Sequence, residues 1–230
     1  MISDPRLIVG LDLPSVDAAR AMVERLGDGV SAYKVGLTLL ARPDGVRFAQ
    51  ALREAGKLVF QDWKLHDIGA QVEGAARSVA EGGCDLLTVH AEPQVMAAAV
   101  KGRGSADTRI LAVTVMTSLS DADLREIGYA SAAAELVERR VRQAIDAGCD
   151  GVVASPLEAT RVREIAGPDF LVVTPGVRPV GAELGDQQRV ATPAAALSAG
   201  ATHLVVARPV IAAGDPGQAA AAIVREMAGA

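Results

Sequence analysis

A lysine stands between two carboxylates in the segment D-W-K-L-H-D, residues 62–67, which has the pattern D-x-K-x-x-D. If this segment is a β-strand, side chains two residues apart share a face, so Asp62 and Lys64 lie together while Trp63 points away. Neighbouring negative charges favour the protonated form of a lysine. The pattern therefore predicts an ammonium group that is ready to donate a proton, with a purely structural ion pair as the alternative. A divalent metal site is disfavoured here because the lysine already supplies a cation.

Lysine is scarce in this chain, which makes its positions informative. Of the 23 basic residues only four are lysines, namely Lys34, Lys57, Lys64 and Lys101. An arginine keeps its charge at any working pH, whereas a lysine can be tuned to release a proton. Because Lys34 and Lys64 both fall in predicted strands, we expect them to serve one site, as a proton donor or as a compact positive charge.

Two arginines in the C-terminal part of the chain are candidates for binding a phosphate group. Arg178 and Arg208 each come at the end of an apolar run typical of a strand. Arginine binds phosphate through paired charge-assisted hydrogen bonds, and Gly176 allows a ligand to approach the backbone closely. The polar segment 179–191 is long for a strand-to-helix connection, which predicts a lid in which Gln187 donates a hydrogen bond to the phosphate. A surface loop without a ligand is the alternative.

The elements that would position these residues alternate regularly along the chain. Short runs rich in aliphatic and β-branched residues are separated by Ala-rich stretches of helical character, four of which end in glycine. The predicted strands are 7–12, 31–36, 58–64, 86–90, 110–116, 151–155, 170–175 and 203–208. Eight such units predict one domain over residues 1–230, an α/β fold of the (β/α)₈ TIM barrel type, with a doubly wound sheet as the alternative.

In a barrel of parallel strands, the side chains that do chemistry project from the C-terminal strand ends. Polar residues fall at that end of one predicted strand after another: Asp12, Lys34, the segment 62–67, His90, Thr117 with Ser118, Arg178 and Arg208. One polar residue at a strand end is ordinary, because strand ends reach solvent, but the series predicts a single site at the barrel mouth. His66 and His90 are expected to support this site, whereas His203 begins its strand at the opposite end and is expected to be structural.

Composition limits the other classes of function. Half of the residues are hydrophobic and only 3% are aromatic, which suits buried parallel strands flanked by helices. A net charge of −5 and a pI near 5.3 argue against nucleic acid as a partner. No apolar run is long enough to cross a membrane. Cys84 and Cys149 lack metal-ligand spacing and are predicted to be buried thiols in a reduced cytoplasm, with a disulfide as the alternative.

The chain resembles the bacterial orotidine 5′-monophosphate decarboxylases over nearly all of its length. The motifs that carry this resemblance are G-L-D-L at Asp12, Y-K-V-G at Lys34, D-W-K-L-H-D-I, T-V-H-A at His90, V-M-T-S, T-P-G-V-R-P at Arg178, D-Q-Q-R-V at Gln187 and A-R-P at Arg208. The resemblance implies a lyase of pyrimidine biosynthesis that converts orotidine 5′-monophosphate to uridine 5′-monophosphate. It also implies a cytoplasmic homodimer that works without a metal or cofactor.

The same resemblance implies a role for each matching residue. Lys64 would protonate the ring carbon within a network of Lys34, Asp62, Lys64 and Asp67, in which Asp67 reaches into the neighbouring subunit's site. The implied substrate contacts are those of Asp12 and Lys34 with the ribose, of Thr117 and Ser118 with the pyrimidine, and of Arg178, Gln187, Ala207 and Arg208 with the phosphate.

Three positions depart from the family pattern. Gly69-Ala70-Gln71 stands where Pro-Asn-Thr or Pro-Glu-Thr is frequent, so the contribution of the partner subunit beyond Asp67 is open, and Gln71 is a candidate substitute. Ala207 replaces a usual glycine beside the phosphate, and Trp63 replaces a usual leucine that is expected to face away from the ligand.

Two other functions compete with this one. Related sugar-phosphate decarboxylases, such as the 3-keto-gulonate 6-phosphate enzymes, share D-x-K-x-x-D but use magnesium and carry a glutamate where Lys34 stands here. A barrel that binds nucleotides without catalysis is the second alternative. Lys34 in place of that glutamate argues against the magnesium-dependent enzymes. The presence of both Lys34 and Lys64 in a lysine-poor chain argues against the non-catalytic barrel.

Overall fold

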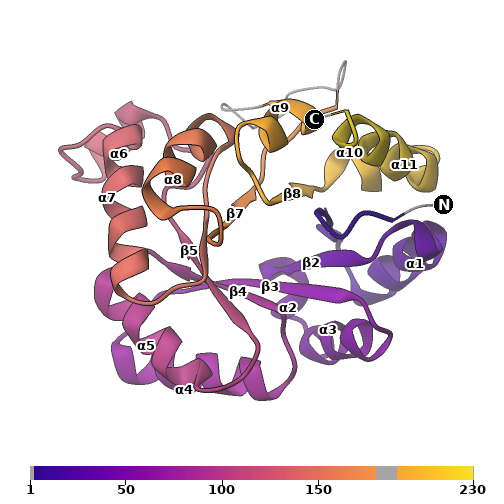
Figure 1. Ribbon diagram of the computed structural model, residues 1–230. Coiled ribbons are helices and arrows are strands. Elements are labelled where there is room, and N and C mark those ends of the chain that lie inside the picture. The colour runs from indigo at the N-terminus through magenta and orange to yellow at the C-terminus, as the bar shows by residue number, and fades with distance from the viewer. Residues whose placement is uncertain (1–2, 180–190, 230) are drawn as a thin grey trace.

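The computed structural model describes residues 3–179 and 191–229. Eight parallel strands pair in chain order and close into a barrel (Figure 1). The strands are β1 (Leu7–Gly10), β2 (Ala32–Gly36), β3 (Leu58–Leu65), β4 (Leu86–His90), β5 (Arg109–Val113), β6 (Gly151–Val153), β7 (Leu171–Thr174) and β8 (His203–Val206). The predicted TIM barrel is confirmed. The doubly wound alternative is wrong, because β1 pairs with β8, with Leu7 opposite Leu204, and this pairing closes the sheet.

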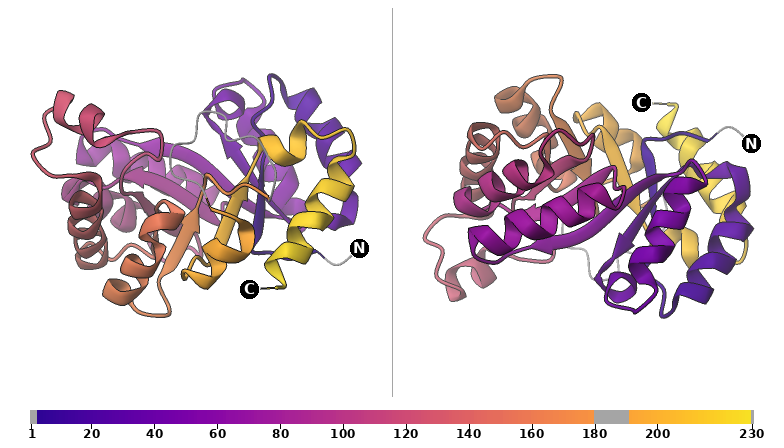
Figure 2. Two further views of the ribbon diagram at one scale, coloured as in Figure 1. Left: turned by 90° about the horizontal axis from the view of Figure 1, so that it is seen from above. Right: turned by 90° about the horizontal axis from the view of Figure 1, so that it is seen from below.

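The helices lie outside the strands and surround them (Figures 1 and 2). They are α1 (Val16–Leu26), α2 (Leu37–Leu40), α3 (Gly45–Glu54), α4 (Gly69–Glu81), α5 (Pro93–Arg103), α6 (Asp121–Glu126), α7 (Ala133–Asp146), α8 (Ala159–Ala166), α9 (Pro193–Ser198), α10 (Arg208–Ile211) and α11 (Pro216–Met227). Short 3₁₀ turns cover Gly27–Gly29 and Pro156–Glu158. Helices α1 and α11, from opposite ends of the chain, pack side by side. No helix in the described ranges is long and apolar enough to span a bilayer.

Side chains alternate between the two faces of the barrel wall. Along β5, Leu111 faces the barrel interior, where it packs with Phe60 and Val173. Its neighbours Ile110 and Ala112 pack instead in the apolar layer beneath the helices. This alternation follows from the pleat of a strand, which sends successive side chains to opposite faces. The interior therefore stays narrow and apolar below the mouth.

Several strands end earlier than their sequence runs predict. β1 ends at Gly10 rather than at residue 12, β5 at Val113 rather than 116, and β8 at Val206 rather than 208. Beyond β1, the Leu13 amide bonds to the Leu11 carbonyl at 2.9 Å, so the backbone has already turned away from strand pairing. Asp12, Thr117 and Ser118 therefore stand on loops at the mouth, whereas Arg208 is the first residue of α10.

The helix ends and the cysteines follow the sequence closely. The four glycines at the predicted helix ends have left-handed backbones, with φ of 76° at Gly56 and 79° at Gly148, for example. Cys84 and Cys149 are both buried and free, so the disulfide alternative is wrong.

Candidate active site

A cavity of about 450 Å³ opens where the C-terminal ends of the strands meet. Nine of the residues predicted for the site lie on its wall: Asp12, Lys34, Asp62, Lys64, Thr117, Ser118, Arg178, Ala207 and Arg208. Apolar side chains of the barrel interior, among them Phe60 and Val205, form its floor. A cavity with an apolar floor and a few convergent polar groups is typical of a small-molecule site.

One predicted residue within the described ranges, Asp67, does not line this cavity. Asp67 is exposed, and its carboxylate accepts a hydrogen bond from the Ile68 amide at 2.7 Å. Asp67 forms no ion pair with Lys64 within residues 3–179 and 191–229. Gln187 lies outside the described residues.

A chain of alternating charges runs along one side of the cavity. The Lys34 ammonium lies 2.9 Å from Asp12 Oδ1 and 3.5 Å from Asp62 Oδ2. The Lys64 ammonium lies 2.8 Å from the same Asp62 Oδ2. Asp62 is therefore shared by two lysines, and Lys34 is shared by two aspartates.

Burial and charge compete at the centre of this chain. Burial by itself would lower the pKa of Lys34, but the charges of Asp62 and Asp12 outweigh it, and the pKa is raised above 10.5. For Asp62, burial would raise the pKa, but the charges of Lys34 and Lys64 and hydrogen bonds outweigh it, and the pKa is lowered below 3.8. At neutral pH Asp62 is an anion and Lys34 a cation.

Two glycines make room for Lys34. A Cβ atom at Gly36 would lie 3.0 Å from the Lys34 ammonium and 3.3 Å from Asp12 Oδ1. A Cβ atom at Gly10 would lie 3.0 Å from the Ala207 methyl group and 3.3 Å from Lys34 Cε. Any larger residue at either position would have to displace the lysine or its partner.

A bulge in β3 aims Lys64 at the cavity. Gln61 pairs with Leu87 and Leu65 with Val89, so residues 62–64 stand opposite Thr88 alone. Lys64 has φ of 50°, and it is the only non-glycine residue in the described ranges with a positive φ. Left-handed backbones and bulges at such positions often re-aim a functional side chain.

Thr88 fills this bulge and was missed by the sequence analysis. Its hydroxyl accepts a hydrogen bond from the Lys64 amide at 3.0 Å and donates one to Asp62 Oδ1 at 2.8 Å. Thr88 is fully buried, so both bonds are shielded from water. The sequence feature that could have identified Thr88 is its position as a polar residue within the otherwise apolar run L-L-T-V.

Trp63 points away from the cavity, as the alternation predicted. Its indole N–H donates to Gln61 Oε1 at 2.9 Å. The ring lines a second, apolar cavity on the outer side of β3, together with Val46 of α3 and Val79 of α4. A tryptophan in place of the usual leucine therefore changes the packing beneath the helices and not the wall of the site.

The two arginines stand on the β7 and β8 sides of the cavity. Arg178 is buried, whereas Arg208 is the exposed first residue of α10. Gly176 has φ of 76°, which favours glycine, but Ala207 has φ of −111°. Position 207 therefore does not need the positive φ that glycine allows.

The loop after β5 carries Thr117 and Ser118, and a buried arginine stabilises its first residues through hydrogen bonds. Arg140 of α7 donates hydrogen bonds to the Thr114 carbonyl, to the Tyr129 hydroxyl at 2.8 Å and to Glu92 Oε1 at 3.3 Å. Sequence reasoning did not single out Arg140 or Glu92, because their partners come from distant segments.

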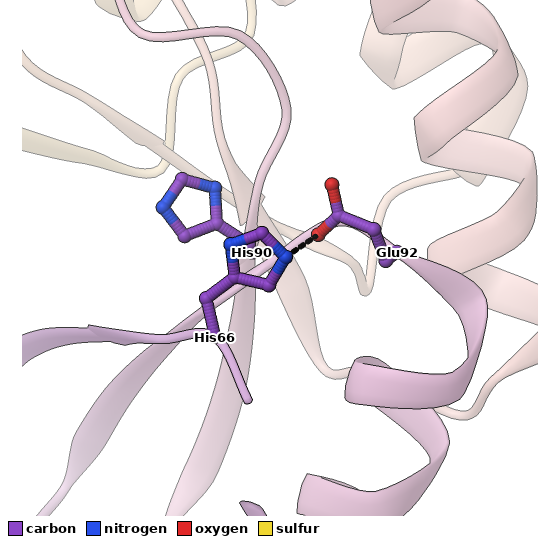
Figure 3. Close-up of side chains that lie close together, drawn as sticks. All are labelled: His66, His90 and Glu92. Atoms are coloured by element: carbon purple, nitrogen blue, oxygen red, sulfur yellow. Dashed lines mark ion pairs between the residues drawn. The ribbon is translucent and has the colours of Figure 1, made fainter. Parts of the chain in front are cut away.

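The three histidines lie at the ends of the barrel that their strand positions predict. His203 begins β8 at the end of the barrel opposite the cavity. His66 and His90 lie near the mouth and form a group with Glu92 (Figure 3).

Comparisons with known proteins agree with this geometry. The family model described as orotidine 5′-phosphate decarboxylase / HUMPS family matches residues 5–223. The chain is 66% identical to the orotidine 5′-phosphate decarboxylase of Caulobacter sp. (strain K31), with 100% of both chains covered. It is 56% identical to that of Rhodopseudomonas palustris (strain BisB5), with 97% and 94% covered. The crystal structure of orotidine 5′-phosphate decarboxylase from Lactobacillus acidophilus aligns with a TM-score of 0.84 at 36% identity, covering 96% of this chain and 98% of that one.

Proposed function

The chain belongs to the orotidine 5′-phosphate decarboxylase / HUMPS family, and from that premise we propose how it converts orotidine 5′-monophosphate to uridine 5′-monophosphate. The activity is that of a carboxy-lyase of pyrimidine biosynthesis, the name carried by its relatives. The catalytic cavity belongs to one domain, formed by residues 1–230, and its side chains carry out the reaction as follows.

The observation that carries the proposal is the Lys64 ammonium, held 2.8 Å from a buried carboxylate on the cavity wall. Loss of carbon dioxide breaks the bond to the ring carbon and leaves its electron pair there, with no conjugated group to accept it. The Lys64 ammonium stabilises that charge and then donates its proton to the carbon. Uridine 5′-monophosphate results, and Lys64 regains a proton from water.

Asp62 and Lys34 organise this proton donor. Asp62 stays ionised between two lysines and faces the substrate carboxylate, and the repulsion between them is relieved when carbon dioxide leaves. Asp12 and Lys34 hold the ribose. Thr117 and Ser118 hold the pyrimidine.

The phosphate is bound away from the reacting carbon. Arg178, Arg208 and Gln187 bind it, with the backbone at Ala207 close by. Interactions with a remote group contribute to catalysis when they help to organise the charged network around the reacting carbon.

Lys34 also supports the nucleotide reaction over the magnesium-dependent reaction of the sugar-phosphate enzymes. Its ammonium lies between Asp12 and Asp62. A divalent cation at this point would need the same two carboxylates as ligands, so the lysine occupies its place. The reaction that we propose therefore needs neither a metal nor a cofactor.

A homodimer completes the site in this proposal, with Asp67 donated to the partner's cavity. The exposed Asp67 is followed by Ile68, whose surface is 70% exposed, and Leu37 beside the same mouth is 51% exposed. Apolar side chains that flank an exposed carboxylate are typical of a surface that a second subunit covers. We place the enzyme in the cytoplasm, which agrees with its two free buried thiols.

Turnover in the presence of EDTA tests the chemistry. We expect purified enzyme treated with EDTA to consume orotidine 5′-monophosphate, followed by its ultraviolet absorbance, and Lys64→Ala to abolish the reaction. A requirement for added magnesium would support the sugar-phosphate alternative. Tight binding of nucleotide without turnover would support the non-catalytic alternative.

Mixing two inactive variants tests the role of Asp67. Asp67→Asn and Lys64→Ala are each expected to be inactive alone. After subunits are exchanged, a mixed dimer has one complete site if Asp67 acts across the interface, so about one site in four recovers in a random mixture. No recovery in a mixture that is shown to exchange subunits would contradict the cross-subunit role.

A further inference from the structure

Two histidines and a glutamate meet beside the catalytic cavity without lining it (Figure 3). His66 follows β3, His90 ends β4 and Glu92 is the N-cap of α5. One possible ligand atom from each residue lies within 4.8 Å of those of the other two. Figure 3 shows the Glu92 carboxylate directed at the His66 ring, with 3.6 Å between Glu92 Oε2 and His66 Nε2.

These donors match the preferences of a divalent transition metal. Imidazole nitrogens and a carboxylate oxygen bind Zn²⁺ at about 2.0–2.2 Å, and three protein ligands leave a fourth position open. In a tetrahedral site the ligand atoms then lie about 3.3–3.5 Å apart. The His66–Glu92 pair is already near this separation. The ligand atoms of the other pairs lie at most 4.8 Å apart, so an approach of up to about 1.5 Å remains. The His66 side chain is more than half exposed and lies beside the His90 ring, so a small rotation can bring the ligand atoms together.

The surroundings hold the Glu92 carboxylate in an orientation that can bind a metal. Arg140 donates to Glu92 Oε1 at 3.3 Å, which fixes the carboxylate and leaves the other oxygen directed at His66. Glu92 Oε2 is buried and accepts no hydrogen bond from the described residues. The bound metal would replace the weak His66–Glu92 ion pair.

We propose that His66, His90 and Glu92 bind one divalent ion of the Zn²⁺ class, and that the bound ion slows decarboxylation. Lys64 lies two residues before His66 and Asp67 lies directly after it, so the ion fixes the segment that carries the proton donor. It also adds positive charge beside the Lys64 ammonium. The inhibitory part of this inference rests on the proposed function, whereas the binding part does not.

Equilibrium dialysis of the untagged, full-length protein against Zn²⁺ tests the binding part. We expect one ion per chain. In His66→Gln, which changes an exposed side chain and should fold normally, the affinity should fall by more than the 10- to 100-fold typical of losing an outer-shell partner. His203→Gln changes the third histidine at the far end of the barrel and should leave binding unchanged. Absence of a stoichiometric ion, or equal binding by His66→Gln and the unmodified protein, would overturn the proposal.

Turnover tests the inhibitory part. Increasing Zn²⁺ should slow the loss of orotidine 5′-monophosphate absorbance, EDTA should restore the rate, and His66→Gln should need more than 10-fold more Zn²⁺ for the same inhibition. Full activity with the site occupied would overturn the inhibition. If the protein never consumes this substrate, the proposed function fails, while dialysis still decides whether the metal site exists.

Discussion

Replacement of Asp62 by asparagine should destabilise the protein as well as stop the reaction. The variant keeps the shape of the side chain but removes the one carboxylate that Lys34 and Lys64 share, at 3.5 Å and 2.8 Å. Two ammonium groups then face each other with no anion between them. Because both Asp62 and Lys34 are nearly inaccessible, with side chains 11% and 12% exposed, water compensates little of this loss.

The magnitude follows from this burial. Removal of one partner from a buried ion pair costs up to about 3–5 kcal/mol, and Lys34 then keeps only its half-exposed partner Asp12. Asp12→Asn is the matched control, since Asp12 also contacts Lys34, at 2.9 Å, but is 51% exposed. Loss of an exposed pair costs only about 0.2–1 kcal/mol. We therefore expect the two variants to differ by several kcal/mol in the free energy of unfolding.

The difference in unfolding free energy between Asp62→Asn and the unmodified protein should depend on pH. In the unmodified protein the pKa of Lys34 is raised above 10.5, so its contribution is present below pH 10.5 and is lost as pH rises through the folded-state value. Without Asp62, only Asp12 opposes the effect of burial, so we expect the pKa of Lys34 to be lower than in the unmodified protein. The penalty in Asp62→Asn is then largest near neutrality and shrinks as pH rises toward 10.

Urea unfolding at pH 7 and pH 9.5, at one protein concentration, measures both effects. Equal destabilisation by Asp62→Asn and Asp12→Asn would refute the reasoning from burial. A loss of unfolding free energy in Asp62→Asn that grows with pH would refute the assignment of Lys34 as the charge that is destabilised.

Three further predictions concern other parts of the molecule. Arg208→Ala should lower kcat/KM for orotidine 5′-monophosphate about 100-fold, because two charge-assisted hydrogen bonds of about 1.5 kcal/mol each are lost. The turnover of orotidine, which has no phosphate, should be unchanged. An equal loss for both substrates would contradict the phosphate role. Burial raises the pKa of Cys84 and of Cys149 to about 12, so a thiol reagent at pH 8 should label neither in the native protein and both in urea. Trp63→Leu should leave kcat and KM unchanged but lower the free energy of unfolding by about 0.5–3 kcal/mol, because the ring packs outside the barrel. A changed kcat would show that Trp63 acts on the site.

Much of this architecture was predictable because it repeats along the chain. Most strands are short apolar runs, and the polar residues within β2 and after β1, β5, β7 and β8 converge on one cavity. The alternation of a single strand predicted that Asp62 faces the cavity and Trp63 faces away from it, whereas Lys64 reaches the same cavity through the bulge in β3. Local patterns suffice for such features since the pleat of a strand is a local property.

The features that escaped prediction depend on contacts between distant segments. Thr88 acts on Lys64 through a register shift between β3 and β4, and no pattern within either strand indicates a bulge. Arg140 and Glu92 are 48 residues apart in the chain and meet only in the folded barrel. The left-handed backbone of Lys64 is likewise unexpected for a lysine, because only its surroundings stabilise it.

A crystal structure of the protein with bound uridine 5′-monophosphate tests the central claim most directly. The quantity to measure is the distance from the Lys64 ammonium nitrogen to the pyrimidine carbon that carries the carboxylate in the substrate. We expect about 3–3.5 Å, within reach for proton transfer, with Lys64 still paired to Asp62. A Lys64 that points away from the ring, or a divalent ion bound between Asp12 and Asp62, would contradict the account.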